Sequence, residues 1–183
     1  MDRSLVERAQ HGDRDAYERL ARASAERMYT VAYQIARDHD RADDAVPQAL
    51  VEMWRDLPSL RDADRFEAWT YRLVTRACLQ ELRRRRRVQV VELSPDDVIE
   101  QPGDFAADTA LRDQLQHALA SLTPDHRAVV VLRHLSGLPL EEIAEVLGVP
   151  LGTVASRLHH ATRSLRAAID AGERPAVIGG QPA

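Results

Sequence analysis

The sequence predicts an all-α protein, built as two small helical domains joined by a flexible acidic linker. Apolar residues recur every three or four positions through most of the chain, which is the spacing of an amphipathic helix. Only nine prolines and eight glycines interrupt its 183 residues, of which 44% are hydrophobic. The periodicity disappears near the middle of the chain, where the charges are negative. We therefore expect a first domain over residues 1–87, the linker over 88–108, a second domain over 109–171 and a disordered tail over 172–183.

The first domain is expected to hold four helices. After a short amphipathic turn, Asp13 is suited to cap a long second helix that runs to about Arg37. Asp38 or Asp40 can cap the third helix, which Pro58 stops. The apolar positions of the second helix keep helical spacing and are Ala16, Tyr17, Leu20, Met28, Val31, Ala32 and Ile35.

Pro47 lies within the pattern of the third helix. A proline in a helix interior costs about 3 kcal/mol, because it removes a backbone hydrogen bond and clashes with the preceding turn. We therefore expect this helix to start or kink near Asp44. As the N-cap, Asp44 would place Pro47 at the third helical position, where a missing N–H matters little. The apolar stripe of this helix comprises Val46, Ala49, Leu50, Met53, Trp54 and Leu57.

A fourth helix follows a short charged loop, residues 59–64, and ends in five consecutive arginines, Arg83–Arg87. Trp69 falls on the apolar stripe, so we expect its ring in the core rather than on the surface. Five arginines at 100° per residue surround a helix, so they can hold phosphates but cannot read bases on one face. A merely solubilising basic end is the alternative. The stripe comprises Phe66, Trp69, Leu73, Ala77 and Leu82.

The linker is expected because helical spacing is lost between residues 88 and 108. Pro95, Pro102 and Gly103 interrupt this segment. Its charged residues are all acidic: Asp96, Asp97, Glu100, Asp104 and Asp108, with Glu92 before them. A flexible spacer is often acidic, so this composition is permissive of a linker rather than diagnostic of its role.

The second domain is expected to begin with two helices. Thr123 followed by Pro124 is an N-cap with proline at the first helical position, and Gly137 ends the helix that starts there. The apolar positions are Leu111, Leu115, Ala118 and Leu122 in the first of these helices, and Val129, Leu132 and Leu135 in the second.

The stretch from Leu140 to Leu165 is typical of a helix-turn-helix. Gly148 sits where a helix-ending residue with positive φ is needed, after a short helix whose apolar face is Ile143, Ala144 and Leu147. The following helix buries a stripe at steps of four, three and four, made of Val154, Leu158, Ala161 and Leu165. The outward face, with Ser156, His159, His160 and Arg163, could enter a DNA major groove. The alternative is an ordinary helical hairpin.

Several classes of protein are disfavoured. No apolar run approaches the roughly 20 residues that span a bilayer, and the N-terminus lacks a signal peptide, so we expect a cytoplasmic protein that does not bind membranes. Cys78 is the only cysteine, and no HExxH or CxxC spacing occurs, so we expect no disulfide, no metal and no cofactor. No nucleophile paired with a base and no phosphate loop appear, so we expect no enzyme.

Five features occur in an order that resembles the extracytoplasmic-function (ECF) sigma factors of the sigma-70 family. They are GDRDAYERL, RADDAVPQALVEMW, RFEAWTYRL leading into the arginine run, the linker, and LTPDHRAVVVLRHLSGLPLEEIAEVLGVPLGTVASRLHHA. The resemblance covers about residues 4–168. It implies that the first domain is a region-two helical bundle and the second a region-four helix-turn-helix. The implied function is that of an RNA polymerase sigma factor, which binds core RNA polymerase and directs promoter-specific transcription initiation.

The resemblance also implies partners and contacts. The partners are core RNA polymerase, promoter DNA and an anti-sigma factor, and the acidic linker is implied to thread polymerase channels. The helix matching residues 44–54 docks on polymerase in the family, and its candidate polar contacts here are Asp44, Gln48, Glu52 and Arg55. A solvated helix face is the alternative interpretation of those four residues. This block departs from the family pattern at Ala45, Pro47, Gln48 and Leu50.

The same resemblance assigns two sets of DNA contacts. Candidates for the −10 promoter element, where an unpaired strand needs cationic grooves, are Arg61, Arg65, Arg72, Arg76, Arg83 and Arg84. Candidates for the −35 element are Thr153, Ala155, Ser156, Arg157, His159, His160 and Arg163. The helical periodicity independently places several of the −35 set on one exposed face. A different class remains open, an autonomous helix-turn-helix transcriptional regulator that does not depend on core polymerase and carries a sensory or dimerising bundle.

Overall fold

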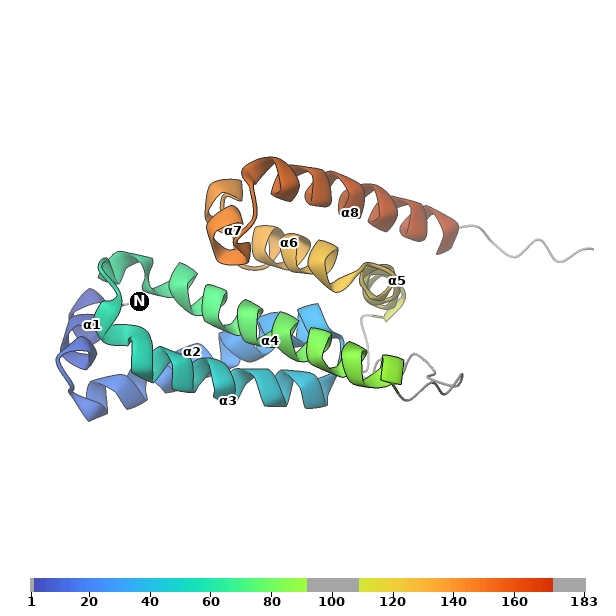
Figure 1. The fold of residues 1–183 in the computed structure, drawn as a ribbon. Coiled ribbons are helices and arrows are strands. Elements are labelled where there is room, and N and C mark those ends of the chain that lie inside the picture. Colours follow the sequence, from blue (N-terminus) through green and yellow to red (C-terminus); the bar gives the residue numbers. More distant parts are fainter. Residues whose placement is uncertain (1, 92–108, 173–183) are drawn as a thin grey trace, which may run out of the picture.

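The computed structural model describes residues 2–91 and 109–172, and within these ranges every regular element is a helix (Figure 1). The all-α prediction is confirmed. The elements are α1 (Arg3–Gln10), α2 (Arg14–Ala36), α3 (His39–Asp56), the short 3-10 turns η1 (Leu57–Ser59) and η2 (Ala63–Arg65), α4 (Phe66–Val91), α5 (Thr109–Ala120), α6 (Pro124–His134), α7 (Leu140–Leu147) and α8 (Leu151–Gly172). None of these helices combines the length and apolar character that a membrane span needs.

Short polar side chains start the helices as the sequence predicts. The Ala16 N–H donates to the Asp13 carboxylate at 3.0 Å, which caps α2. At α6, Thr123 is the N-cap and Pro124 the first helical residue. Of the two candidates for the third helix, Asp38 is the cap.

The predicted start of the third helix near Asp44 is wrong. Asp38 begins α3 six residues before Asp44, and the helix continues unbroken to Asp56, so the proline lies in its interior. The carbonyl of Asp43, four residues earlier, therefore has no N–H to accept. Pro47 is exposed, so water can reach this part of the backbone. The first turns of α3 are held by buried Ala42 and Ala45, and this tertiary packing outweighs the local cost of the proline.

Three large side chains assigned to the core are exposed instead. Trp54 of α3 is 47% exposed, Leu115 of α5 is 41% exposed and Leu135 after α6 is 53% exposed. In α5, Leu119 is the buried leucine beside Ala118. The periodicity finds each helix, but a residue at the edge of an apolar stripe is buried only where a neighbouring helix covers it.

The boundaries of the predicted linker and tail shift slightly. The helix α4 runs to Val91, four residues past the predicted end of the first domain, and α8 includes Gly172. The remainder of the linker, 92–108, with its acidic residues and expected path through polymerase, lies outside the described residues, as does the tail, 173–183.

The helices form two layers (Figure 1). In one layer α1–α4 make the N-terminal bundle, and in the other α5–α8 make the C-terminal module, with α4 running between them. The two layers touch: α6 packs on α2 and α4, and α7 packs on α4. Ala128 and Val131 of α6 are buried within the core of the N-terminal bundle. The modules therefore share part of one hydrophobic core.

Candidate nucleic-acid and polymerase interfaces

The turn between α7 and α8 has the geometry that the sequence predicts. Gly148 ends α7 in the left-handed region, with φ 64°, and its N–H donates to the carbonyl of Ala144. On α8, Val154 and Ala161 are fully buried. The opposite face is exposed and carries five of the predicted −35 residues, namely Ala155, Ser156, His159, His160 and Arg163.

The two other predicted −35 residues lie at the edge of that face. Thr153 and Arg157 are half-buried. The Arg157 guanidinium lies 3.8 Å from the carboxylate of Asp125, in the first turn of α6. Arg157 is therefore directed partly toward its own module, whereas the five exposed residues face solvent.

His126 adds to the recognition surface and is absent from the sequence prediction. Its ring lies nearly parallel to that of His160, with centroids 6.4 Å apart, and the His159 ring is 5.8 Å from His160. The N-cap at Thr123 places His126 in the first turn of α6, but only the packing of α6 against α8 brings it beside the recognition helix. A single helix pattern cannot reveal that contact.

The predicted −10 arginines follow α4. Trp69, Arg72, Arg76 and Arg83 are separated by three, four and seven residues, so they share one face of α4, and Arg65 lies at the end of η2 just before this helix. All four arginines are exposed. Such a stripe suits a phosphate backbone, because arginine presents a planar fork of donors to phosphate oxygens.

A groove of about 230 Å³ lies at the start of this stripe. Arg61, Arg65 and Arg72 line it together with Trp69, while α7 contributes Glu142, Glu145 and Val146 to the opposite wall. Trp69 is half-buried and packs near Phe66, with ring centroids 6.0 Å apart, so it joins the core and also borders the groove. An aromatic ring between arginines is the combination that holds single-stranded nucleic acid.

Acidic side chains divide the −10 arginines into two groups. Arg61, Arg72 and Arg76 form no ion pair with any residue in the described ranges, whereas Arg65, Arg83 and Arg84 each meet a carboxylate. The strongest of these contacts is between Arg84 and Glu81, with two hydrogen bonds of 2.9 and 3.0 Å.

Glu81 is a functional candidate that sequence reasoning missed. It is 8% exposed and binds both Arg84 and Arg85, and these hydrogen bonds hold the pKa of its carboxyl below the ordinary value. Arg85 also donates to Asp44 of α3 at 3.1 Å. A carboxylate three and four residues before two arginines is the signal that could have found this network.

The predicted polymerase-binding residues of α3 lie on one side of the helix. Asp44, Gln48 and Arg55 are exposed, and Glu52 is half-buried. Asp44 is engaged by Arg85, and Arg55 donates to its neighbour Asp56, whose pKa it lowers. Within the described residues neither Gln48 nor Glu52 forms a side-chain hydrogen bond or ion pair, and Glu52 Oε2 is buried without a hydrogen-bond partner.

An apolar patch accompanies these polar residues. Val51 is 66% exposed and Trp54 is 47% exposed, with the Trp54 ring edge-on to Tyr17 at 4.5 Å between centroids. Val51 lies three residues after Gln48 and four before Arg55, on the same side of α3. The sequence analysis did not single out Val51, although its spacing from Gln48 and Arg55 places it on the same side of the helix. It also assigned Trp54 to the core.

Comparisons with known proteins identify the two modules. The sigma-70 region 2 family matches residues 20–88, and the sigma-70 region 4 family matches residues 112–165. The chain is 35% identical over 157 residues to the ECF RNA polymerase sigma factor SigE of Mycolicibacterium smegmatis, covering 82% of this chain and 60% of the relative. It is 30% identical over 180 residues to the RNA polymerase sigma-H factor of Pseudomonas aeruginosa, covering 92% of this chain and 93% of the relative.

Solved structures have the same fold. The sigma factor RpoE of Bartonella quintana, in complex with the anti-sigma factor NepR, superposes with a TM-score of 0.69 at 23% identity, covering 86% of this chain and 98% of that one. CnrH in complex with the cytosolic domain of CnrY superposes with a TM-score of 0.66 at 26% identity, covering 93% and 97%. The two matched regions, their order and the long relatives together place this chain in the ECF sigma factors of the sigma-70 family.

Proposed function

We propose that this RNA polymerase sigma factor divides its work among three surfaces. The exposed side of α3 binds core RNA polymerase, the arginine stripe of α4 holds the −10 element, and the outward face of α8 reads the −35 element. The observation that carries the proposal is that most members of each predicted contact set are exposed and lie on a helix of the matching sigma region. In this proposal the protein works in the cytoplasm and has no catalytic activity of its own.

An anti-sigma factor is the proposed regulatory partner. The support comes from RpoE of Bartonella quintana, which was solved with the anti-sigma factor NepR. That sigma factor shares this fold over most of both chains.

The autonomous-regulator alternative is disfavoured, because both sigma regions and full-length sigma relatives match this chain. It differs from the proposal in a measurable way. An autonomous regulator binds duplex DNA tightly by itself, whereas a sigma factor acts through core polymerase.

Run-off transcription with purified core polymerase tests the proposal. Promoter fragments are first selected from genomic DNA by the reconstituted holoenzyme. We expect transcripts only when both core polymerase and this protein are present, and only from fragments with two conserved elements. Tight binding of a palindrome by the protein alone, with no transcript in the reconstituted reaction, would refute it.

A further inference from the structure

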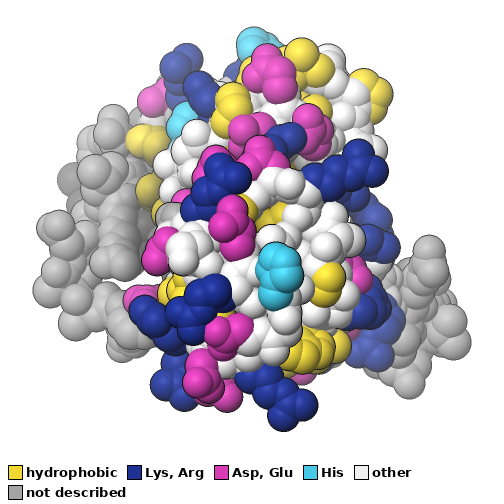
Figure 2. Space-filling model, turned by 90° about the vertical axis from the view of Figure 1, so that its left-hand side faces the viewer, with side chains coloured by type: hydrophobic (Ala, Val, Ile, Leu, Met, Phe, Trp, Pro, Cys, Tyr) yellow, Lys and Arg dark blue, Asp and Glu magenta, His cyan; other side chains and the backbone are white. Residues whose placement is uncertain are grey.

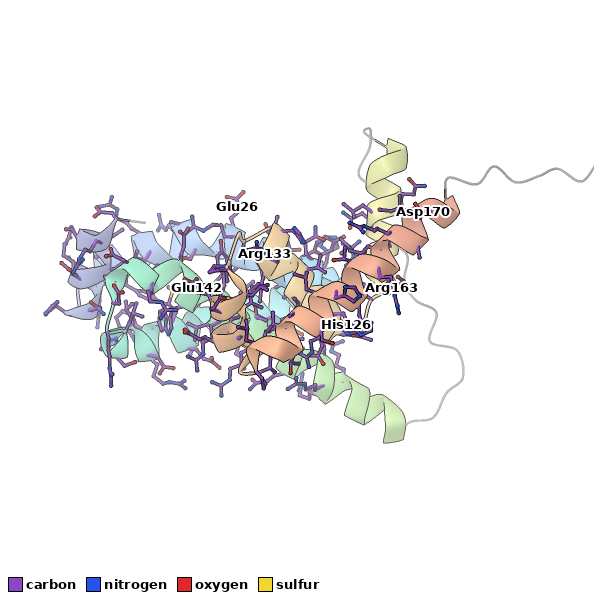
Figure 3. All side chains as sticks on the ribbon, turned by 90° about the horizontal axis from the view of Figure 1, so that it is seen from above. Glu26, His126, Arg133, Glu142, Arg163 and Asp170 are labelled. Carbon is purple, nitrogen blue, oxygen red and sulfur yellow. The ribbon has the colours of Figure 1, made fainter. Side chains whose placement is uncertain are left out.

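The groove at the start of the −10 stripe is bordered by acids from the other module. The Arg65 guanidinium donates to the Glu145 carboxylate of α7 at 2.8 Å. Glu142 lines the same groove, and the charges of Glu145 and then Glu142 raise the pKa of Arg65. Figure 3 shows Glu142 on α7, above the helices of the N-terminal bundle. Two carboxylates thus face the arginines that would hold a DNA strand.

A third acid meets the stripe about five helical turns farther along. The Arg83 guanidinium lies 3.8 Å from the carboxylate of Asp125 in α6. The region-two arginines at both ends of the stripe are therefore paired with region-four carboxylates. Guanidinium binds carboxylate and phosphate through the same planar fork, so these acids present the chemistry of a nucleic-acid backbone.

Apolar contacts lie beside these pairs. Ala128 and Val131 of α6 are 0% and 4% exposed, within the core of the N-terminal bundle. Reciprocally, Ala68 and Tyr71 of α4 pack against the core of the C-terminal module. Such contacts are held together by burial, while the acids at the edge fix which surfaces meet.

One residue at the contact between the two modules, Arg127, disfavours the packed arrangement, which we call the closed form. Arg127 is 6% exposed; its Nη2 donates to the Leu122 carbonyl at 3.1 Å, whereas its Nε has no hydrogen-bond partner among the residues that the structure describes. Burial, together with the nearby charges of Arg37 and Arg41, lowers the pKa of Arg127 to about 10. A buried cation without an acid is unfavourable, and separation of the modules would hydrate it. The closed form is consequently one that can open.

The two DNA-reading faces differ in this arrangement. The −35 face of α8 points to solvent, with Ser156, His159 and Arg163 exposed. Figure 2 views the end of the molecule at which α1 and α7 lie, where arginines and acids are interspersed rather than segregated into a basic patch. Closure therefore masks the −10 groove but not the −35 surface.

We propose that in the free protein α7 is a docking surface for the −10 groove of the same chain, with Glu142 and Glu145 in the place of DNA phosphates. The inference rests on the assignment of Arg61, Arg65 and Arg72 to the −10 strand under Proposed function. DNA and α7 compete for these arginines, so the unbound protein reads the −10 strand only after its modules separate.

Distance measurements test closure without DNA. Fluorophores are placed on the full chain at Ala23→Cys of α2 and Ser164→Cys of α8, both exposed positions. The native Cys78 is 1% exposed, so it should resist labelling. We expect one short distance in the wild type, a longer and broader distribution in Arg65→Glu, and a return to the short distance when Glu145→Arg is added. A wild type that is already extended, or a reversed pair that fails to restore the short distance, overturns the inference.

Strand binding tests the competition. The probe is a single-stranded oligonucleotide carrying the −10 sequence found by the holoenzyme selection. Because exposed ion pairs are individually weak, we expect Glu145→Gln to tighten binding by about three- to tenfold, and Glu142→Gln/Glu145→Gln to tighten it further. Asp170→Asn, at the far end of α8 in Figure 3, removes the same charge away from the groove and should change affinity less than twofold. Equal effects of Glu145→Gln and Asp170→Asn overturn the inference.

Arg72→Ala separates the two proposals. Arg72 lines the groove but forms no ion pair within the described residues, so its loss should weaken strand binding at least as much in Glu145→Gln as in the wild type. If Arg72→Ala weakens binding and Glu145→Gln has no effect, the −10 assignment stands and the docking inference fails. If Arg72→Ala has no effect in either background, the −10 assignment itself fails.

Discussion

Single carboxylates separate the arginines proposed to hold DNA into a paired and an unpaired group. Arg72 and Arg76 point to solvent without an ion pair in the part of the chain that the structure describes, while Glu81 holds Arg84 by two hydrogen bonds. At the recognition helix, the exposed positions are filled largely by uncharged or weakly basic side chains, with His160 beside His126. Charge at individual positions is therefore the property most directly open to test.

His160→Arg should strengthen −35 binding. A permanent positive charge on the exposed face of α8 adds a phosphate contact, which steepens the salt dependence of the binding constant by a slope of about 0.9. We expect affinity for a −35 duplex to rise about three- to tenfold at low salt, measured by fluorescence anisotropy with the full chain. His134→Arg, at an exposed position of α6, adds the same charge as a control. If both variants gain equally, His160 does not face the DNA.

Glu81→Gln should lower stability in a pH-dependent way. Arg84 and Arg85 lower the pKa of the Glu81 carboxyl beneath its ordinary value of 4.5, so its stabilising effect is present above that pH and is lost as the pH falls through the lowered value. We expect the variant to be less stable by roughly 0.5–1 kcal/mol at pH 7, since both arginines are partly exposed. The difference should shrink between pH 7 and pH 3 in urea unfolding.

Glu26→Gln on α2 provides the comparison for that experiment, because Glu26 is exposed. It should be neutral at both pH values. A loss of stability in Glu81→Gln that is the same at pH 7 and pH 3 would show that shape, not charge, is responsible.

At the scale of a single helix, α3 combines an interior proline that costs stability with an exposed face that we propose docks on polymerase. It begins at Asp38, contains Pro47 in its interior and exposes Val51 and Trp54. The buried alanines Ala42 and Ala45 hold the turns before the proline against α2 and α4. The side of this helix that we propose binds polymerase is thus mixed, with a polar row and an apolar pair.

Pro47→Gln should stabilise the protein. Removing an interior proline restores a backbone hydrogen bond to Asp43 and relieves the clash with the preceding turn, together worth about 3 kcal/mol, of which about 1 kcal/mol is offset because proline also restricts the unfolded chain. We expect a net gain of about 2 kcal/mol and a Tm higher by about 4–8 °C, measured by thermal unfolding. Pro58→Ala in η1, where no helical N–H is needed, should change stability by less than about 0.5 kcal/mol. An unchanged Tm in Pro47→Gln would mean that α3 accommodates the proline without loss.

Val51→Glu should impair binding to core polymerase and leave folding intact. Val51 is 66% exposed, so no buried contact is lost, and a charge at the centre of an apolar docking patch is poorly tolerated. We expect at least a tenfold loss of affinity in a competition assay with labelled sigma factor. Ala23→Glu on the exposed side of α2 carries the same charge and should bind as the wild type does. Equal losses in the two variants would remove Val51 from the interface.

At the scale of the whole molecule, the local sequence pattern predicts the helices, whereas tertiary packing decides which side chains are buried and which distant residues meet. Helical periodicity and caps predict the helices, and the turn at Gly148 with the outward face of α8 follows from spacing alone. Which stripe-edge residues are buried could not be predicted: Trp54 and Leu135 remain about half exposed, because the described helices cover them only in part. The contact of Arg65 with Glu145 joins residues 80 positions apart, and no local pattern encodes it.

The burial of Ala128 and Val131 in the N-terminal core also bears on how long the protein survives in a cell. Separation of the modules bares apolar faces that polymerase would cover in a holoenzyme and that nothing covers in a solitary open chain. Proteases and aggregation act on such transiently exposed surface in proportion to its population. Arg65→Glu should therefore be cleaved faster than the wild type in limited proteolysis, with core polymerase protecting both. A sigma factor that opens only on its polymerase would thus keep these faces covered while it is alone, and the closed form would protect an excess of free protein from degradation.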